Sequence, residues 1–159
     1  MLNNRKNISP DEAYNRLAAT CSTREVSPAD AADKLRRWGV DPADAQTVME
    51  RLVAEAFLSE ERYARAFVHD KVCFERWGRL KIRQALQAKG IRPAWADRAL
   101  AEVSEAQYAD NLRALMAQKR RTLHEPDAAR CRLKLMRFAA GRGYLMEEIQ
   151  QCLEADGDM

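Results

Sequence analysis

The sequence predicts an all-α protein built as a tandem array of three three-helix repeats, elongated and either straight or curved. Three observations lead to this fold class. Alanine, the best helix former, fills 27 of 159 positions, whereas Val, Ile and Thr, which favour strands, together fill only 15. Signals for helix starts recur along the chain. A pattern of glycine, proline and apolar residues also repeats about every 50 residues.

Helix starts are marked by side chains that can accept a hydrogen bond from the free N–H groups of a first helical turn. The Ser and Asp residues that stand before a proline or a carboxylate at such starts are Ser9, Ser27, Asp41, Ser59 and Ser104. Pro93 and Pro126 also suit first helical positions, although Arg92 and Glu125 before them are poorer caps. Four of the five serines are thereby explained as caps, without a nucleophilic role.

Helix ends are marked by glycines that can adopt the left-handed backbone conformation just past a helix. These glycines are Gly39, Gly78, Gly90 and Gly143. Between starts and ends, apolar residues recur at the i, i+3, i+4 and i+7 spacing of a helix face. Nine helices are therefore expected, over residues 10–22, 28–38, 42–56, 60–76, 79–89, 93–103, 105–122, 126–141 and 145–154.

The expected helices fall into three groups of three. The segment around Gly39 aligns with the one around Gly90 at an offset of 51 residues, and a weaker copy centres on Gly143, 53 residues further on. Such a period is typical of repeats that pack mainly on their neighbours. We expect repeats over residues 9–56, 57–103 and 104–155. The alternative is one irregular bundle in which the similarity is accidental.

The sequence shows no arrangement of residues that is typical of catalysis or of a cofactor site. It has neither a GxxxxGK[ST] nor a GxGxxG loop, and His69 and His124 do not lie at metal-ligand spacing. His69 and Cys73 could imitate a thiol–imidazole pair, but a shared helix edge is the simpler interpretation. We therefore expect a binding protein, with no catalytic residue, metal, cofactor or small-molecule substrate.

Composition also indicates the compartment. No apolar run is long enough to span a membrane, and the chain starts with polar residues, so a cytoplasmic protein is expected. In a reducing compartment the four widely spaced cysteines are expected to be small buried thiols; they are Cys21, Cys73, Cys131 and Cys152.

Positive charge is concentrated in two segments. Residues 76–98 hold seven basic and one acidic residue, and residues 119–137 hold seven and two, against a net charge of +3 for the whole chain. Such clusters are typical of a solvated helix face, of a surface that binds phosphates, or of one that binds carboxylates. The candidate partner-binding residues are Arg76, Arg79, Lys81, Arg83, Lys119, Arg120, Arg121, Arg130 and Arg132. Arg79 is expected to be solvated and to contribute little to stability.

Two central segments resemble the signature of the RecX regulatory proteins. They are the run FLSEERYARAFV over residues 57–68 and the run WGRLKIRQAL over residues 77–86, which Lys89-Gly90-Ile91 follows. Residues 24–35 and 135–144 are similar to the first and third repeats of that family. The chain departs from the family at Asp30-Ala31, where Glu-Leu is favoured; Asp keeps the capping role, but the first core becomes thinner.

The resemblance implies a modulator of the RecA recombinase built from tandem three-helix repeats. Members of the family engage the RecA–single-stranded DNA filament, typically in its helical groove, and suppress strand exchange, ATP hydrolysis and coprotease activity. It therefore implies a role in DNA repair, DNA recombination and the SOS response, with the RecA filament as partner and single-stranded DNA as a further candidate contact. A monomer without a membrane partner is expected as well, the latter because the chain has no apolar run of membrane-spanning length. Two alternatives stay open: a stand-alone nucleic-acid-binding protein without a recombinase partner, and a helical scaffold for another acidic protein.

Overall fold

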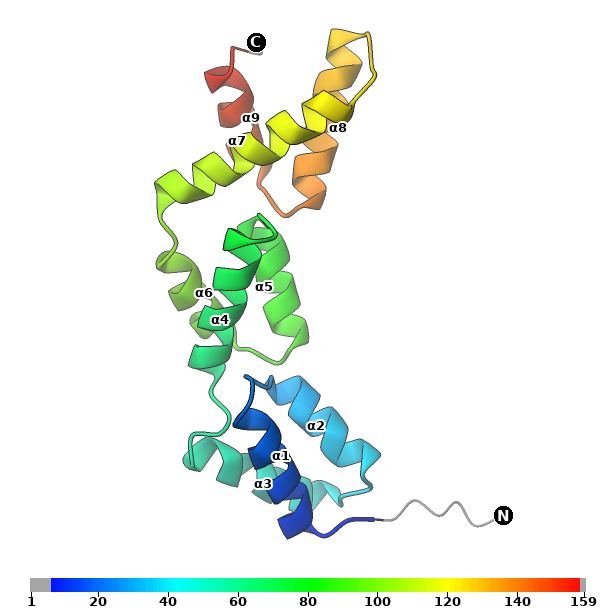
Figure 1. Cartoon of the computed structure of the whole chain (residues 1–159), viewed down its shortest axis with the longest axis vertical. Helices are drawn as coiled ribbons and strands as arrows, with labels where there is room; N and C mark the ends of the chain where they lie inside the picture. The colour runs from blue at the N-terminus through cyan, green and yellow to red at the C-terminus, as the bar shows by residue number, and fades with distance from the viewer. Residues whose placement is uncertain (1–6, 158–159) are drawn as a thin grey trace, which may run out of the picture.

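A computed structural model describes residues 7–157, which form nine α-helices and no strand (Figure 1). The helices are α1 (Pro10–Cys21), α2 (Pro28–Arg37), α3 (Pro42–Ala54), α4 (Glu60–Cys73), α5 (Arg79–Ala88), α6 (Pro93–Ala101), α7 (Glu105–Thr122), α8 (Ala128–Gly141) and α9 (Met146–Ala155). The predicted fold class is confirmed, and no helix end differs from its predicted position by more than three residues.

The helix caps follow the sequence signals in all but one place. Each of the five candidate caps accepts a hydrogen bond from a backbone N–H of its helix. The predicted start of α8 at residue 126, behind Glu125, is wrong, because the Asp127 carboxylate caps the helix by accepting the N–H of Arg130 at 3.1 Å. Glu125 instead accepts the N–H of Asp127 and pairs with Lys134.

Three of the four predicted left-handed glycines are confirmed, namely Gly39, Gly90 and Gly143. The prediction for Gly78 is wrong: its backbone is extended, with φ −80° and ψ 164°, and it caps the start of α5. The left-handed residue of this turn is Arg76, with φ 53°. Gly78 is needed for space instead, because a Cβ atom there would lie 2.2 Å from the carbonyl carbon of Gly143.

The chain is an elongated stack of three units, each with its own hydrophobic core (Figure 1). Leu17, Leu35 and Leu52 belong to the core formed by α1–α3. Ile82 and Leu86 belong to the core of α4–α6, and a third core fills the space between α7, α8 and α9. Separate cores exclude the single irregular bundle. The boundaries after residues 56 and 103 stay predictions.

The two junctions between units are built differently. At the first junction one backbone hydrogen bond, from the N–H of Ala29 to the carbonyl of Lys89, is flanked by the ion pairs Lys89–Asp30 and Arg62–Glu25. The side chains of these pairs are 33–49% exposed. Exposed ion pairs of this kind contribute little to stability. The first junction also has a buried contact, a side-chain hydrogen bond between Tyr63 of α4 and the fully buried Ser27 before α2.

The second junction is held by backbone groups of both units. The N–H of Gly78 donates to the carbonyl of Arg142 at 2.7 Å, and the N–H of Leu80 donates to the carbonyl of Gly143 at 3.1 Å. The buried Tyr144 hydroxyl also donates to the carbonyl of Arg76 at 2.9 Å. Because buried backbone groups must be paired, these bonds fix how the third unit sits on the second.

The close contact at the second junction makes a testable prediction about Gly78. Replacing it with alanine places a methyl group inside the van der Waals radius of Gly143, so we expect the free energy of unfolding to fall by about 1–3 kcal/mol. The matched control is Gly141→Ala in α8, where an added Cβ meets no atom within 4 Å. Chemical denaturation of both variants measures the difference; equal stabilities would contradict the assigned contact.

Candidate partner-binding surface

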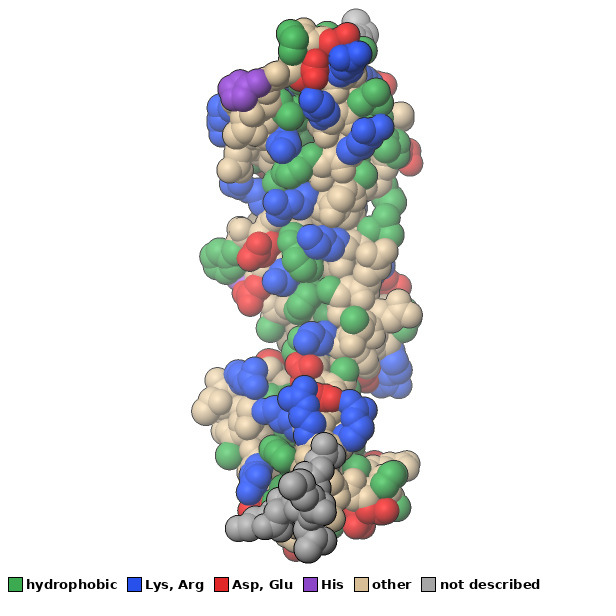
Figure 2. Space-filling model, turned by 90° about the vertical axis from the view of Figure 1, so that its right-hand side faces the viewer, with side chains coloured by type: hydrophobic (Ala, Val, Ile, Leu, Met, Phe, Trp, Pro, Cys, Tyr) green, Lys and Arg blue, Asp and Glu red, His purple; other side chains and the backbone are tan. Residues whose placement is uncertain are grey.

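The second helix of each unit, α2, α5 and α8, lies on the same side of the stack, at the right of Figure 1. Figure 2 faces this side and shows Lys and Arg side chains along its whole length. Lys81 and Arg83 extend from α5, and Arg130 and Arg132 from α8. We call this side, defined by the Lys and Arg residues of these three helices, the basic face.

The structure adds a basic group that sequence reasoning missed. Lys34, Arg36 and Arg37 lie in the last turn of α2, in the first unit. Arg36 and Arg37 both pair with Asp33 of the same helix, and their side chains are 76% and 73% exposed. The net charge of residues 1–75 is −2, so an average over that segment conceals this group. The adjacent pair Arg36-Arg37, at the end of a predicted helix, could have indicated this basic group from the sequence.

Arg79 is not solvated, so the expectation for this residue is wrong. Its side chain is 21% exposed, because the start of α5 abuts α7 and α9. One guanidinium nitrogen lies 2.7 Å from a Glu105 carboxylate oxygen and another lies 3.3 Å from Glu148. Its Cζ also lies 3.9 Å from the centre of the Tyr108 ring. Arg79 thus connects the second unit to the third.

Two buried tyrosines complete the same contact. The Tyr108 hydroxyl accepts the backbone N–H of Arg79 at 3.0 Å, and its ring centre lies 5.1 Å from that of Tyr144. Burial raises the pKa of Tyr108 to about 12 and raises the pKa of Tyr144 as well. Both phenols therefore stay neutral at physiological pH, as their buried, hydrogen-bonded positions require.

Five of the other eight candidates are exposed and three are half-buried, namely Lys81, Lys119 and Arg132, and some rest on aromatic rings. Lys81 Nζ lies 4.2 Å from the Trp77 ring centre, and Lys119 Nζ lies 5.0 Å from that of Phe138. Arg83 pairs with Asp97 at 3.0 Å on the exposed surface. The remaining candidates lie on the end of α7, on α8 and in the turn before α5; they are Arg76, Arg120, Arg121, Arg130 and Arg132. The nine residues thus come from the second and third units.

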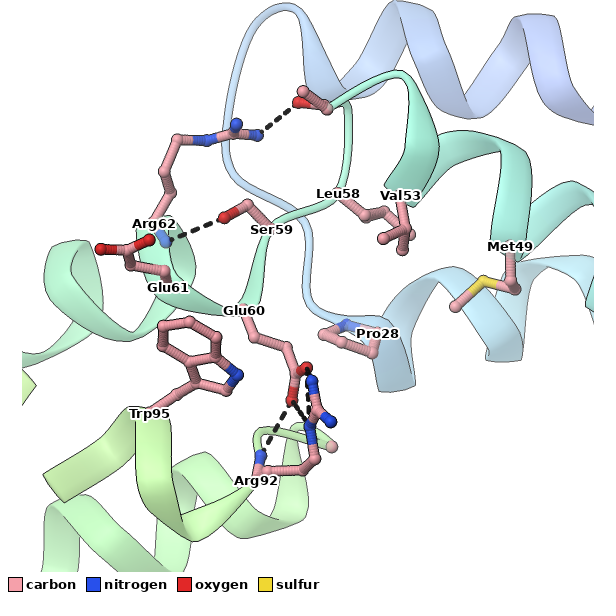
Figure 3. A pocket seen from close by; sticks show the side chains of 12 residues that line it. Pro28, Met49, Val53, Leu58, Ser59, Glu60, Glu61, Arg62, Arg92 and Trp95 are labelled. Carbon is pink, nitrogen blue, oxygen red and sulfur yellow. Dashed lines mark hydrogen bonds and ion pairs between the residues drawn. The ribbon is translucent and has the colours of Figure 1, made fainter. Parts of the chain in front are cut away.

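A hollow of about 510 Å³ lies between the first two units (Figure 3). Glu60 and Arg92 face each other at one side, with 2.7 Å between their charged atoms. Burial alone would raise the pKa of Glu60, but the hydrogen bonds from Arg92 outweigh it and lower that pKa. Ser59 caps α4 by accepting the N–H of Arg62. The Glu60–Arg92 ion pair and the Ser59 cap therefore both have structural roles.

The cysteines only partly follow the expectation of buried thiols. Cys152 is buried and Cys21 and Cys131 are half-buried, but Cys73 is exposed at the end of α4. Its Sγ lies 3.6 Å from Nδ1 of His69, one helical turn away, and 3.6 Å from Nε2 of Gln107. The exposure follows from the helix edge that Cys73 shares with His69.

Within residues 7–157 no helix is long and apolar enough to cross a membrane.

Comparison with known proteins places the chain in a family. A model of the second three-helix domain of RecX matches residues 59–100, and a model of the third three-helix domain matches residues 105–153. A regulatory protein RecX of Pseudomonas fluorescens is 35% identical over 133 residues, 82% of each chain. The chain belongs to the RecX family.

One further relative supports the family assignment, and two solved structures have the same fold. The regulatory protein RecX of Leptothrix cholodnii is 34% identical over 154 residues, which are 96% of this chain and 92% of the relative. A crystal structure of regulatory protein RecX superposes with a TM-score of 0.85 over 91% of this chain and 73% of the other, at 19% identity. The RecX structure from Lactobacillus salivarius gives a TM-score of 0.80 over 92% and 95% of the two chains. These two structures confirm the fold.

The different environments of two arginines on α5 make a second prediction. Arg79→Ala removes two carboxylate contacts from a mostly buried site and is expected to cost about 1–3 kcal/mol of unfolding free energy. Arg83→Ala removes one exposed ion pair and is expected to stay within about 0.5 kcal/mol of the parent. Thermal and urea unfolding measure both. An Arg79→Ala variant as stable as Arg83→Ala would refute the structural role.

Proposed function

We propose that this protein binds the RecA–single-stranded DNA filament and inhibits the recombinase, ATPase and coprotease activities of RecA, and thereby modulates DNA repair and the SOS response. The observation that carries the proposal is the basic face, which collects Lys and Arg side chains from all three units along the long axis (Figure 2). The names of the relatives, regulatory protein RecX, support a regulatory role.

An elongated array suits a filament better than a single globular partner. Each unit presents its own second helix to the same side, so contacts of modest strength can form with successive subunits at once. Linked contacts add in free energy, and the whole array then binds more tightly than any one unit. The basic side chains complement either acidic RecA surface or the phosphates of the bound strand.

The proposal includes how the protein acts. It acts in the cytoplasm as a monomer, by binding and without catalysis, and its three units extend over residues 9–56, 57–103 and 104–155. The proposed contact surface combines the basic face with Arg76, Lys119, Arg120 and Arg121, and it holds eight of the nine sequence-predicted residues. Arg79 is set apart because its guanidinium is engaged with Glu105 and Glu148.

The direct test measures ATP hydrolysis by RecA on single-stranded DNA with this protein added before or after filament assembly. We expect hydrolysis to fall at near-stoichiometric or lower ratios of this protein to RecA, because one array contacts several subunits. Filament length in electron micrographs provides a second readout. Unchanged assembly and ATP turnover with excess protein would refute the proposed function.

Charge reversal tests the contact surface. Lys81 and Arg83 changed together to Glu, or Lys119, Arg120 and Arg121 changed together to Glu, should weaken filament binding at least 10-fold, because repulsion replaces attraction. Helicity measured by circular dichroism should not change, since surface charges contribute little to the fold. Full inhibition of RecA by both variants would show that these residues are not the contact surface.

The basic face also favours a second candidate, a stand-alone nucleic-acid-binding protein without a recombinase partner. The salt dependence of binding to bare single-stranded DNA separates the two. A phosphate-binding surface gives a slope of roughly −0.7 per phosphate contact in a plot of log affinity against log salt. Strong binding to bare DNA without any effect on RecA would favour this second candidate.

A further inference from the structure

A smaller hollow, of about 290 Å³, lies at the second junction, on the rim of the basic face. Its walls come from the turn after α4, from α7 and from α8. We call it the Phe74 pocket, and its chemistry rests on two aromatic rings, three cations and one carboxylate: Phe74, Phe138, Arg76, Lys119, Arg142 and Glu75. Figure 2 shows Lys and Arg side chains gathered at the level where α7 and α8 meet α4 and α5.

Phe74 is unusually exposed for its side chain. It is 76% exposed, although the fold buries Tyr108 and Tyr144 close by in the same junction. Two backbone hydrogen bonds fix the turn that carries Phe74. The N–H of Phe74 donates to the carbonyl of Asp70 at 2.9 Å, and the N–H of Trp77 donates to the carbonyl of Lys71 at 3.0 Å. The Phe74 ring also lies edge-to-face against His69, with 6.2 Å between the ring centres, so an exposed aromatic ring is held beside a charged hollow.

The opposite wall of the pocket supplies positive charge. Lys119 Nζ and Arg142 Cζ lie 5.0 and 5.2 Å from the Phe138 ring centre, so one ring positions both cations. With Arg76, the lining carries three cations against the single carboxylate of Glu75. An anion is therefore favoured inside the pocket, and an aromatic face is available beside it.

We propose that the Phe74 pocket binds one nucleotide of a single-stranded nucleic acid, with its base stacked on Phe74 and its phosphate held by Lys119 and Arg142. Proteins that bind single strands combine a basic groove with exposed aromatic rings in this way, because every base has a π-face and every link a phosphate. Glu75, which also lines the pocket, repels phosphate and so favours its binding at the wall formed by Lys119 and Arg142.

Two other ligands, a nucleic-acid duplex and an acidic peptide, would engage fewer of the groups that line the Phe74 pocket. A duplex offers no free base face to Phe74, because its bases are stacked on one another. An acidic peptide would pair with the three cations, but its carboxylates would not stack on Phe74, whereas each nucleotide offers a phosphate and a base face together. The proposal deepens the proposed function, on which it rests for its biological setting: the bound strand is then the DNA of the RecA filament.

The test measures fluorescence anisotropy of a labelled 20-residue oligodeoxythymidine with the full-length chain, without RecA. Phe74→Ala should weaken binding at least ~5-fold through loss of base stacking, whereas Phe74→Trp should bind as tightly as the parent or more tightly. The matched control is Val53→Ala, an exposed apolar residue on α3, 60% accessible, which should not change binding. Melting temperatures confirm that each variant is folded.

Two further variants test the phosphate side. Lys119→Gln should reduce the salt slope of binding by roughly 0.7, the value of one phosphate contact. Arg113→Gln, on the same helix and paired with Asp110, removes the same charge outside the pocket and should leave the slope unchanged. Photocrosslinking with an iodouracil oligonucleotide should label the tryptic peptide over residues 72–76, which contains Phe74.

The proposal is overturned if the parent chain does not bind the oligonucleotide, if Phe74→Ala binds as tightly as the parent, or if the crosslink maps elsewhere. It is also overturned if an oligoglutamate peptide binds more tightly than the oligonucleotide with the same dependence on Phe74. RecA inhibition is measured separately. A parent chain that binds DNA through Phe74 without inhibiting RecA would refute the proposed function and leave the pocket assignment intact.

Discussion

The close approach of two backbone segments, at Gly78 and Gly143, determines most of what distinguishes this structure. No side chain fits between them, because even a Cβ on Gly78 would lie within 2.2–2.4 Å of three backbone atoms of the opposite segment. At that separation two backbone hydrogen bonds form across the junction, and the start of α5 is brought against α7 and α9. The Arg79 ion pairs, the buried tyrosines and the Phe74 pocket all depend on this approach.

The two junctions give the array an uneven construction. The second and third units share two backbone hydrogen bonds and the bonds of Tyr108 and Tyr144 to the backbone of Arg79 and Arg76, whereas the first unit is attached by one backbone bond, the Tyr63–Ser27 contact and ion pairs near the surface. Buried, fully paired polar groups hold a geometry firmly, while exposed ion pairs are weak and sensitive to salt. The second and third units are therefore joined by more backbone hydrogen bonds than the first and second, and they also carry most of the proposed contact residues.

Basic residues in this protein serve two purposes, and net charge does not distinguish them. Arg79 is mostly buried, binds two carboxylates and holds the junction, whereas Arg83 on the same helix lies on the surface with one exposed partner. Lys119 is positioned by an aromatic ring at the edge of a hollow. A cluster of positive charge in the sequence thus predicts a binding surface only after the residues that support the fold have been set apart.

The sequence by itself determined the nine helices in residues 7–157, because capping, alanine content and apolar spacing act within a few residues of the chain. Ser9, Ser27, Asp41, Ser59 and Ser104 all cap the helices they precede. The repeat of glycine and core positions also predicted the three-unit array, and the RecX resemblance is confirmed.

Only the tertiary structure decided the role of Gly78, the burial of Arg79, the alignment of α2 with α5 and α8, and the exposure of Phe74 beside Lys119 and Arg142. Local signals could not reveal these features, because each depends on a contact between residues that lie tens of positions apart. Gly78 and Gly143, for example, are 65 residues apart in the chain, and only the packing of the third unit on the second brings them together.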